Sequence, residues 1–194
     1  MTRSTAFRLA LAAGSVTLAT IGLLGYRLIA GTPGASDGLP PVGAAARALT
    51  REDAQATAQA VLRLRLNDLD GRQQPLAQWQ GKVLVINFWA SWCAPCVEEM
   101  PVFSRLHERH VAQGVQFVGI GVDDVDKLRS FVSTRPVSYP VLVAGSETTA
   151  LPGVNLRGLP YTLVLDRNGQ VDSFRLGRLD EATLDPILRR LSAP

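Results

Sequence analysis

The sequence predicts an α/β fold in which a central mixed sheet is flanked by helices. Apolar runs of strand length alternate with segments of helical pattern, and this alternation is typical of sheets that contain parallel strands. The run 83–89 is apolar apart from Asn87, as expected of a central strand that is buried on both faces. Two short apolar runs flank Asn168-Gly169, which is a strong signal for an antiparallel hairpin.

Each element follows from a local pattern. A short helix from Thr50 through Ala60 is expected because Thr50 can cap it, with Asp53 as a partial capping-box partner. Pro101 is expected to kink the helix that contains it, and Pro186 is expected to make the last helix irregular. Strands are expected at 62–66, 83–89, 115–121, 139–143, 161–165 and 171–176. Helices are expected at 97–113, from 123 or 124 to about 134, and from about 181 to 191.

The N-terminal region has the pattern of a membrane segment. Residues 9–26 contain no charged side chain, and extension to residue 30 makes the run about long enough to span a bilayer as a helix. Positive charge at Arg3 and Arg8 favours a cytoplasmic location for residues 1–8 and export of the rest. A cleaved signal peptide has the same charge order, and Gly34-Ala35-Ser36 offers a weak cleavage site. The length of the run favours a transmembrane anchor or uncleaved signal over 9–30.

The rest of the chain divides into a tether and one domain. Residues 31–58 are expected to form a linker that includes the short helix, and 59–194 suit a single domain with its own core. Residues 1–36 hold three Arg and no acid, so the remaining 17 Lys and Arg balance 17 Asp and Glu. The basic excess therefore belongs to the membrane segment, and the charge pattern argues against a nucleic-acid partner.

Cys93 and Cys96 are the only cysteines in the chain, and they follow the apolar run 83–89 at the start of a helical segment. A strand that leads into Cys-x-x-Cys at a helix start is the layout of a redox site. The free N–H groups at the helix start favour a thiolate at Cys93, and the thiolate is the attacking species in disulfide exchange. Cys93 is therefore the expected nucleophile, and Cys96, one turn on, is the expected resolving thiol.

Three other interpretations of this pair are weaker. With His107 and His110 the pattern becomes Cys-x2-Cys-x10-His-x2-His. Zinc fingers have longer spacings, which argues against a zinc site. Both histidines are instead expected on the surface of the helix. A purely structural disulfide would close too short a loop to stabilise the fold much. A peroxidatic cysteine would need Pro and Thr at the positions that Ile86 and Ala90 occupy. We therefore expect no metal and no cofactor.

The segment F-W-A-S-W-C-A-P-C-V-E-E-M-P at 88–101 resembles the TlpA/ResA branch of the thioredoxin superfamily. That branch carries Trp-Cys-x-Pro-Cys, then Glu three residues on and Pro two further. The segment 158–162 is similar to the one in which this fold places a cis-proline facing the cysteines, and 68–71 and 81–82 resemble the family's opening hairpin and strand entry. The resemblance covers about residues 60–192. It implies a thioredoxin-like fold with an N-terminal hairpin extension, and thiol–disulfide oxidoreductase activity.

The resemblance also implies a role for an acid. Glu99 lies one helical turn beyond Cys96, where TlpA/ResA-like proteins have an acid beside the cysteines. A partly buried carboxylate can take a proton from the resolving thiol. Thioredoxin uses an Asp on the preceding strand, but Asn87 occupies that position here and Asn is not a base. Glu99 is therefore the candidate base, and the adjacent Glu98 is its control.

Four further residues are expected to bind the partner protein. Trp92 would cover the disulfide and give partners an apolar contact. Pro95 lies between the cysteines, in the dipeptide that affects the redox potential. By resemblance the Leu159–Pro160 bond is cis, which would leave the Leu159 backbone free to pair with an extended substrate strand.

The resemblance implies a single-pass protein of the cytoplasmic (inner) membrane whose catalytic domain faces the periplasm or another extracytoplasmic space. It would reduce cysteine-containing partners there, either apocytochrome c or copper-site proteins, with electrons from a membrane donor of the DsbD/CcdA kind. Haem-maturation members often have Glu after the cis-proline, and Tyr161 departs from that pattern. The alternative function is a copper-binding metallochaperone or scaffold. A CxxC pair suits Cu(I), although the only methionines are Met1 and Met100.

Overall fold

The computed structural model describes residues 49–145, 148 and 158–193, so the expected anchor over 9–30 lies outside the described residues. The described chain forms one sheet of seven strands in the order β2-β1-β5-β4-β3-β6-β7. Strands β3, β4 and β5 are parallel, and the other neighbours pair antiparallel. The strands are β1 (Arg65–Asp68), β2 (Gln73–Pro75), β3 (Val83–Trp89), β4 (Val115–Gly121), β5 (Val141–Val143), β6 (Tyr161–Leu165) and β7 (Val171–Leu176). The predicted mixed sheet is confirmed.

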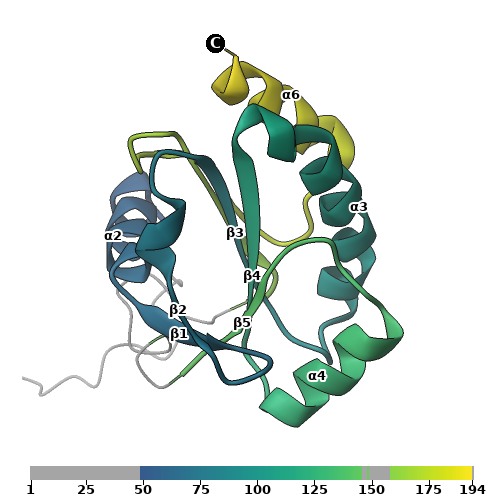
Figure 1. Ribbon diagram of the computed structural model, residues 1–194. Coiled ribbons are helices and arrows are strands. Elements are labelled where there is room, and N and C mark those ends of the chain that lie inside the picture. The colour runs from purple at the N-terminus through teal and green to yellow at the C-terminus, as the bar shows by residue number, and fades with distance from the viewer. Residues whose placement is uncertain (1–48, 146–147, 149–157, 194) are drawn as a thin grey trace, which may run out of the picture. The chain divides into compact units, whose positions relative to one another are not determined.

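Helices cover both faces of this sheet (Figure 1). One face carries α2, and the other carries α3 and α6. Helix α4 lies near the start of α3, and Leu128 of α4 is in the same cluster as Met100 of α3. The helices are α2 (Arg51–Leu62), α3 (Ala94–His110), α4 (Val125–Thr134) and α6 (Glu181–Ser192), with 3-10 turns η1 (Leu76–Trp79) and η2 (Val111–Gln113). Alternate side chains of β3 pack on opposite faces of the sheet. Leu84, Ile86 and Phe88 pack in the cluster that contains α2, and Val83 and Val85 pack in the one that contains α3 and α6.

Helix α2 is part of the folded unit. Thr50 Oγ accepts the Asp53 N–H (3.1 Å) and the Asp53 carboxylate accepts the Thr50 N–H (3.0 Å), which completes a capping box. Ala54, Ala58 and Val61 are fully buried in the core. This helix packs on β6 and β7, so it is folded against the sheet, although most of it was assigned to the linker over 31–58.

The strand predicted at 62–66 lies at Arg65–Asp68, so it begins three residues later and ends two residues later than expected. Helix α2 continues to Leu62, and β1 begins only at Arg65. It forms a hairpin with β2, and Asn67 pairs with Val143 of β5, so the hairpin extends the sheet at one edge. Gly71 in its turn has φ of +84°, a conformation that favours glycine. This hairpin is the predicted N-terminal extension.

The two histidines of α3 are buried, which corrects the expectation that they lie on the helix surface. His107 is 8% exposed and packs edge-on against Phe117 of β4. His110 is 2% exposed, and its Nε2 lies 2.7 Å from Asp185 of α6. His110 is buried because α6 packs against α3. The Asp185 carboxylate of α6 supplies the hydrogen-bond partner that a buried imidazole needs.

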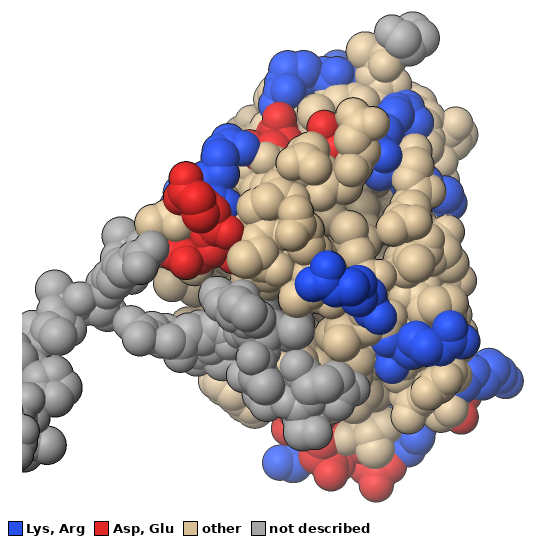
Figure 2. Space-filling model, turned by 90° about the vertical axis from the view of Figure 1, so that its left-hand side faces the viewer, with Lys and Arg blue, Asp and Glu red and all other residues tan. Residues whose placement is uncertain are grey.

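The surface carries charges of both signs. Figure 2 shows Lys and Arg as well as Asp and Glu among uncharged side chains on one face of the molecule. The described chain also contains surface ion pairs, among them Arg190 with Asp172 at 2.8 Å and Arg72 with Asp70 at 2.7 Å. Within residues 49–145, 148 and 158–193, no helix has both the length and the apolar character needed to cross a membrane.

Candidate redox site

The cysteine pair lies where β3 leads into α3. Cys93 is the N-cap of α3, and its carbonyl accepts the N–H groups of Cys96 (3.0 Å) and Val97 (3.1 Å). The two sulfurs form a disulfide with an S–S distance of 2.02 Å. Pro95 is in the first helical turn, where its missing N–H costs no hydrogen bond. The sequence therefore places both sulfurs at a helix start, as the motif predicted.

The two cysteines differ in access to solvent. Cys93 is 4% exposed and Cys96 is fully buried. Both pack against Trp89, Ala90 and Met100 in one cluster. Trp92, in contrast, is 69% exposed, so it is a surface residue beside the disulfide and not a core aromatic. The structure therefore leaves an aromatic ring exposed next to a slightly exposed sulfur.

The loop before β6 also contacts the cluster that contains the cysteines. The Leu159–Pro160 peptide bond is cis. Leu159 packs against the cluster that contains both cysteines, and the Pro160 carbonyl accepts the Gly177 N–H at 2.8 Å. The structure therefore brings Leu159, which is about 60 residues further along the chain, to the cysteine pair.

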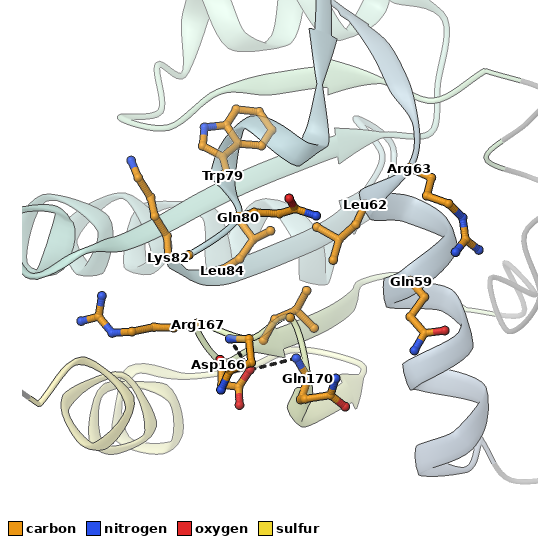
Figure 3. Close-up of a pocket in the computed structure, with 14 residues that line it drawn as sticks. Gln59, Leu62, Arg63, Trp79, Gln80, Lys82, Leu84, Asp166, Arg167 and Gln170 are labelled. Carbon is orange, nitrogen blue, oxygen red and sulfur yellow. Dashed lines mark hydrogen bonds between the residues drawn. The ribbon is translucent and has the colours of Figure 1, made fainter.

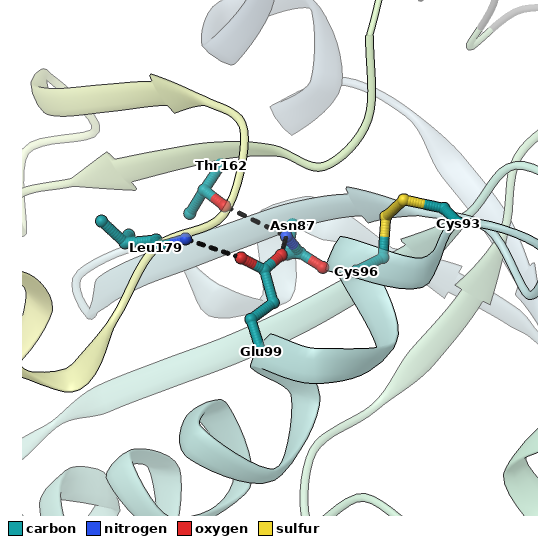
Figure 4. The surroundings of a disulfide bond; sticks show 6 residues. All are labelled: Asn87, Cys93, Cys96, Glu99, Thr162 and Leu179. Carbon is teal, nitrogen blue, oxygen red and sulfur yellow. Dashed lines mark hydrogen bonds between the residues drawn. A yellow bond between two sulfur atoms is a disulfide. The ribbon is translucent and has the colours of Figure 1, made fainter.

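A buried polar network lies beneath the disulfide (Figure 4). Glu99 is 1% exposed, and both of its carboxylate oxygens accept hydrogen bonds. Oε1 accepts from the Asn87 amide nitrogen (2.8 Å) and Oε2 from the Leu179 backbone N–H (2.9 Å). The Asn87 amide nitrogen also donates to Thr162 Oγ1 (3.0 Å). The Asn87 side chain lies between the Glu99 carboxylate and Cys96 in Figure 4.

Burial changes the acidity of Glu99. Loss of hydration raises the pKa of Glu99 from its ordinary value of 4.5 to about 7, and this effect exceeds the lowering by the hydrogen bonds from Leu179 and Asn87. Glu98 is 62% exposed and makes only a surface ion pair with Arg178 at 3.4 Å. The two adjacent glutamates therefore differ in environment, and the pKa of the buried Glu99 lets it change protonation state near neutral pH.

The raised pKa of Glu99 predicts a pH-dependent stability. A carboxyl group whose folded-state pKa exceeds its unfolded value stabilises the fold fully below the unfolded pKa, near 4.5, and loses this effect as pH rises through about 7. We therefore expect the free energy of unfolding of the oxidised protein to fall, relative to Glu99→Gln, by up to roughly 3 kcal/mol between pH 4.5 and 8. Urea titrations at several pH values measure this difference. Glu98→Gln should follow wild type, and parallel pH profiles for wild type and Glu99→Gln would contradict the prediction.

Sequence reasoning missed two members of this network. Thr162 is a polar residue in the otherwise apolar, buried β6, and that pattern could have indicated it. Leu179 contributes its backbone N–H from a loop 80 residues away from Glu99. No side-chain pattern could have indicated that contact.

The structure does not bring the two histidines of the zinc-finger-like spacing to the cysteines. His107 and His110 lie roughly 16 Å or more along α3 from Cys96, from the rise per residue of a helix, and they contact Ser138 and Asp185 instead. In the part of the chain that the structure describes, no group of three or more His, Cys, Asp or Glu side chains could hold a metal ion.

A pocket of about 360 Å³ lies at the other end of β3 (Figure 3). The C-terminal end of α2, the segment after η1 and the β6–β7 turn form it, and its lining includes Trp79, Lys82 and Arg167. Lys82 precedes the first residue of β3, whereas the cysteines follow the last, so roughly 20 Å of strand separates them. None of the site residues predicted from the sequence lines this pocket.

Known proteins that are similar to this chain include thiol–disulfide oxidoreductases, as the redox site indicates. The AhpC/TSA family pattern matches residues 57–174, which is more than half of the chain. Thiol-disulfide oxidoreductase ResA of Bacillus anthracis is 28% identical over 129 residues, which cover 66% of this chain and 73% of that protein.

Solved structures show the same fold. A thiol:disulfide interchange protein of the thioredoxin family from Chlorobium tepidum is 27% identical, with a TM-score of 0.61 over 67% of this chain and 93% of that one. A secreted Mycobacterium tuberculosis disulfide oxidoreductase, homologous to E. coli DsbE, is 27% identical, with a TM-score of 0.57 over 69% and 97% of the two chains. The chain thus belongs to the AhpC/TSA family and is a thioredoxin-like thiol–disulfide oxidoreductase similar to ResA.

Proposed function

We propose that this protein is a membrane-anchored, extracytoplasmic reductant of cysteine pairs in partner proteins. The observation that carries the proposal is the asymmetry of the cysteine pair. Cys93 lies at the helix start beside the exposed Trp92, whereas Cys96 is fully buried. Such a pair can present one sulfur to a partner and keep the other for the resolving step.

The exchange reaction proceeds in two steps. The Cys93 thiolate attacks one sulfur of a partner disulfide, a mixed disulfide forms, and the other partner sulfur leaves as a thiolate. Cys96 then loses its proton and attacks the Cys93 sulfur, which closes the Cys93–Cys96 disulfide and releases the second partner thiolate. Two electrons pass to the partner. A membrane electron donor of the DsbD/CcdA kind would restore the dithiol.

Glu99 is the base that we assign to the second step. Its pKa of about 7 lets it hold a proton or release it near neutral pH. Its carboxylate bonds to Asn87 and Leu179 in the disulfide form, so transfer from Cys96 requires an intervening water or a rotation of the side chain.

The partner-binding surface that we propose consists of Trp92, Pro95 and Leu159, and the predicted Pro160, which forms the cis bond with Leu159, is itself buried. Trp92 and Pro95 are exposed, and Leu159 lies against the cysteine cluster. An extended partner segment would pair with the Leu159 backbone while its cysteine meets Cys93. The partners that we propose are extracytoplasmic proteins with cysteine pairs, either apocytochrome c or copper-site proteins.

The reduction potential of the Cys93–Cys96 couple tests the direction of the reaction. We expect a value near that of thioredoxin, roughly −270 mV, because a reductant must hold its electrons weakly enough to give them away. Equilibration with glutathione or dithiothreitol buffers, followed by mass spectrometry of alkylated protein, measures it. A value near that of a strong oxidant, roughly −120 mV, would reverse the proposed direction.

The membrane location rests on the apolar run at residues 9–30. The extracytoplasmic location has separate support, because one relative with a solved structure is described as secreted. We expect the mature protein to keep this segment and to sediment with membranes until detergent is added. N-terminal sequencing of the protein from its native host checks the prediction. A mature N-terminus near Ser36 or Asp37 would instead establish cleavage.

A further inference from the structure

Asn87 holds a buried position between the acid and the buried cysteine. It lies in β3 and is 1% exposed. Its amide nitrogen has two hydrogens, and both have acceptors, Glu99 Oε1 at 2.8 Å and Thr162 Oγ1 at 3.0 Å. The donor side of the amide is therefore fully used, on the side away from the cysteines (Figure 4).

The acceptor side of the same amide is free. Asn87 Oδ1 is buried and has no hydrogen-bond partner, and it points toward Cys96 in Figure 4. The opposite amide orientation would place Oδ1 against the Glu99 carboxylate, so the network fixes the orientation that is seen. A buried carbonyl without a donor is unfavourable. In the disulfide form the Cys96 sulfur carries no hydrogen and offers no donor.

We propose that Asn87 is a positioning residue for Cys96, and that the Cys96 thiol donates its hydrogen to Asn87 Oδ1 once the disulfide is reduced. The inference rests on the proposed exchange reaction. Reduction breaks the S–S bond with two electrons and two protons from a dithiol, which itself becomes a disulfide, and it leaves a hydrogen on Cys96. The hydrogen bond therefore exists only in the reduced protein.

This hydrogen bond has two consequences for the reaction. It holds Cys96 as a thiol while Cys93 makes the first attack, so the two sulfurs act in order. It also connects Glu99 to Cys96, because the amide nitrogen bonds the carboxylate and the amide oxygen points toward Cys96. Asn87 cannot itself act as a base, but its amide links the Glu99 carboxylate to the Cys96 thiol.

The reduction equilibrium tests the proposal with a matched pair of variants. Asn87→Leu removes the acceptor for Cys96, so the reduced form loses its added stability. We expect the equilibrium constant for reduction by dithiothreitol to fall about tenfold, a shift of about 30 mV to more negative potential. Thr162→Val removes the other partner of the Asn87 nitrogen and leaves Oδ1 in place. It should stay within twofold of wild type, and an equal shift in both variants would overturn the proposal.

Two spectroscopic measurements do not depend on the equilibrium. In the dithiothreitol-reduced protein, the S–H stretching band should lie at lower frequency in wild type and Thr162→Val than in Asn87→Leu. The wild-type Asn87 side-chain carbonyl carbon should also shift in NMR spectra on reduction, and this remains testable if Asn87→Leu does not fold. A carbon resonance that is the same in both redox forms, or one S–H band position in all three proteins, would refute the hydrogen bond.

These outcomes are separable from those of the proposed function. Dithiothreitol reduces the protein without any partner, so the spectroscopic result stands even if the measured potential is that of an oxidant. Conversely, a potential near that of thioredoxin together with an unchanged Asn87 resonance would support the reductant and overturn the role of Asn87.

Discussion

Cys96→Ser should convert the protein from a catalyst into a trap that stays joined to its partner. Without the resolving thiol, the mixed disulfide between Cys93 and the partner has no internal sulfur to displace it. We expect this variant to accumulate disulfide-linked complexes in the native membrane, with turnover reduced to the uncatalysed background. Non-reducing gels before and after dithiothreitol, with mass spectrometry of the released partner, measure the complexes and name the partner.

Cys93→Ser is the matched control, because it keeps Cys96 and removes the sulfur at the helix start. It should give neither turnover nor trapped complexes, since Cys96 is fully buried. In the reduced wild-type protein, Cys93 should correspondingly react with iodoacetamide faster than Cys96 near neutral pH. Complexes trapped through Cys96 in Cys93→Ser, or preferential labelling of Cys96, would reverse the two roles.

Much of the fold could be predicted because the central strands β3, β4 and β6 are short, mostly apolar runs. The predicted limits of β4, β6 and β7 agree with the structure. Asp166 and Gly169 close the β6–β7 hairpin locally. The start of β1 was wrong, because the leucines at 62, 64 and 66 fit a strand, whereas Leu62 also continues the buried face of α2.

The sequence could predict only those features of the site that depend on the spacing of residues along one helix. The order of Cys93, Cys96 and Glu99 along one helix start could be obtained from their separations in sequence. Burial raises the pKa of Glu99, and the hydrogen bond from Leu179 partly opposes this effect. Neither the burial nor that contact follows from spacing. The burial of His110 depends in the same way on where α6 packs. Long-range contacts of this kind are set by the tertiary arrangement and lie beyond any sequence periodicity.

The environment of Glu99 also determines how its role in catalysis can be tested. Only the ionised carboxylate can accept a proton from Cys96, and with a pKa of about 7 this form dominates above neutral pH. A base of this kind contributes roughly 10²-fold or more to a proton-transfer step. The contribution should therefore appear as pH rises through about 7 and be absent near pH 5.5.

Glu99→Gln should slow the resolving step roughly 100-fold at pH 8, and by much less at pH 5.5, where the wild-type carboxyl is already protonated. The inflection near pH 7 in the wild-type rate should disappear in the variant. Stopped-flow exchange with a fluorescent disulfide substrate measures the resolving rate. Alkylation rates of Cys93 should be followed in parallel, because removal of a nearby negative charge also eases thiolate formation and partly offsets the loss.

Glu98→Gln provides the comparison, since Glu98 is exposed and pairs only with Arg178 on the surface. It should retain both the wild-type rate and the inflection. If Glu99→Gln, with its fold intact by circular dichroism, matches wild type at pH 8 in the resolving rate and in Cys93 reactivity, Glu99 is not the base. The proton of Cys96 must then leave directly to water, and the buried carboxylate would serve only to hold Asn87 and the Leu179 backbone in place.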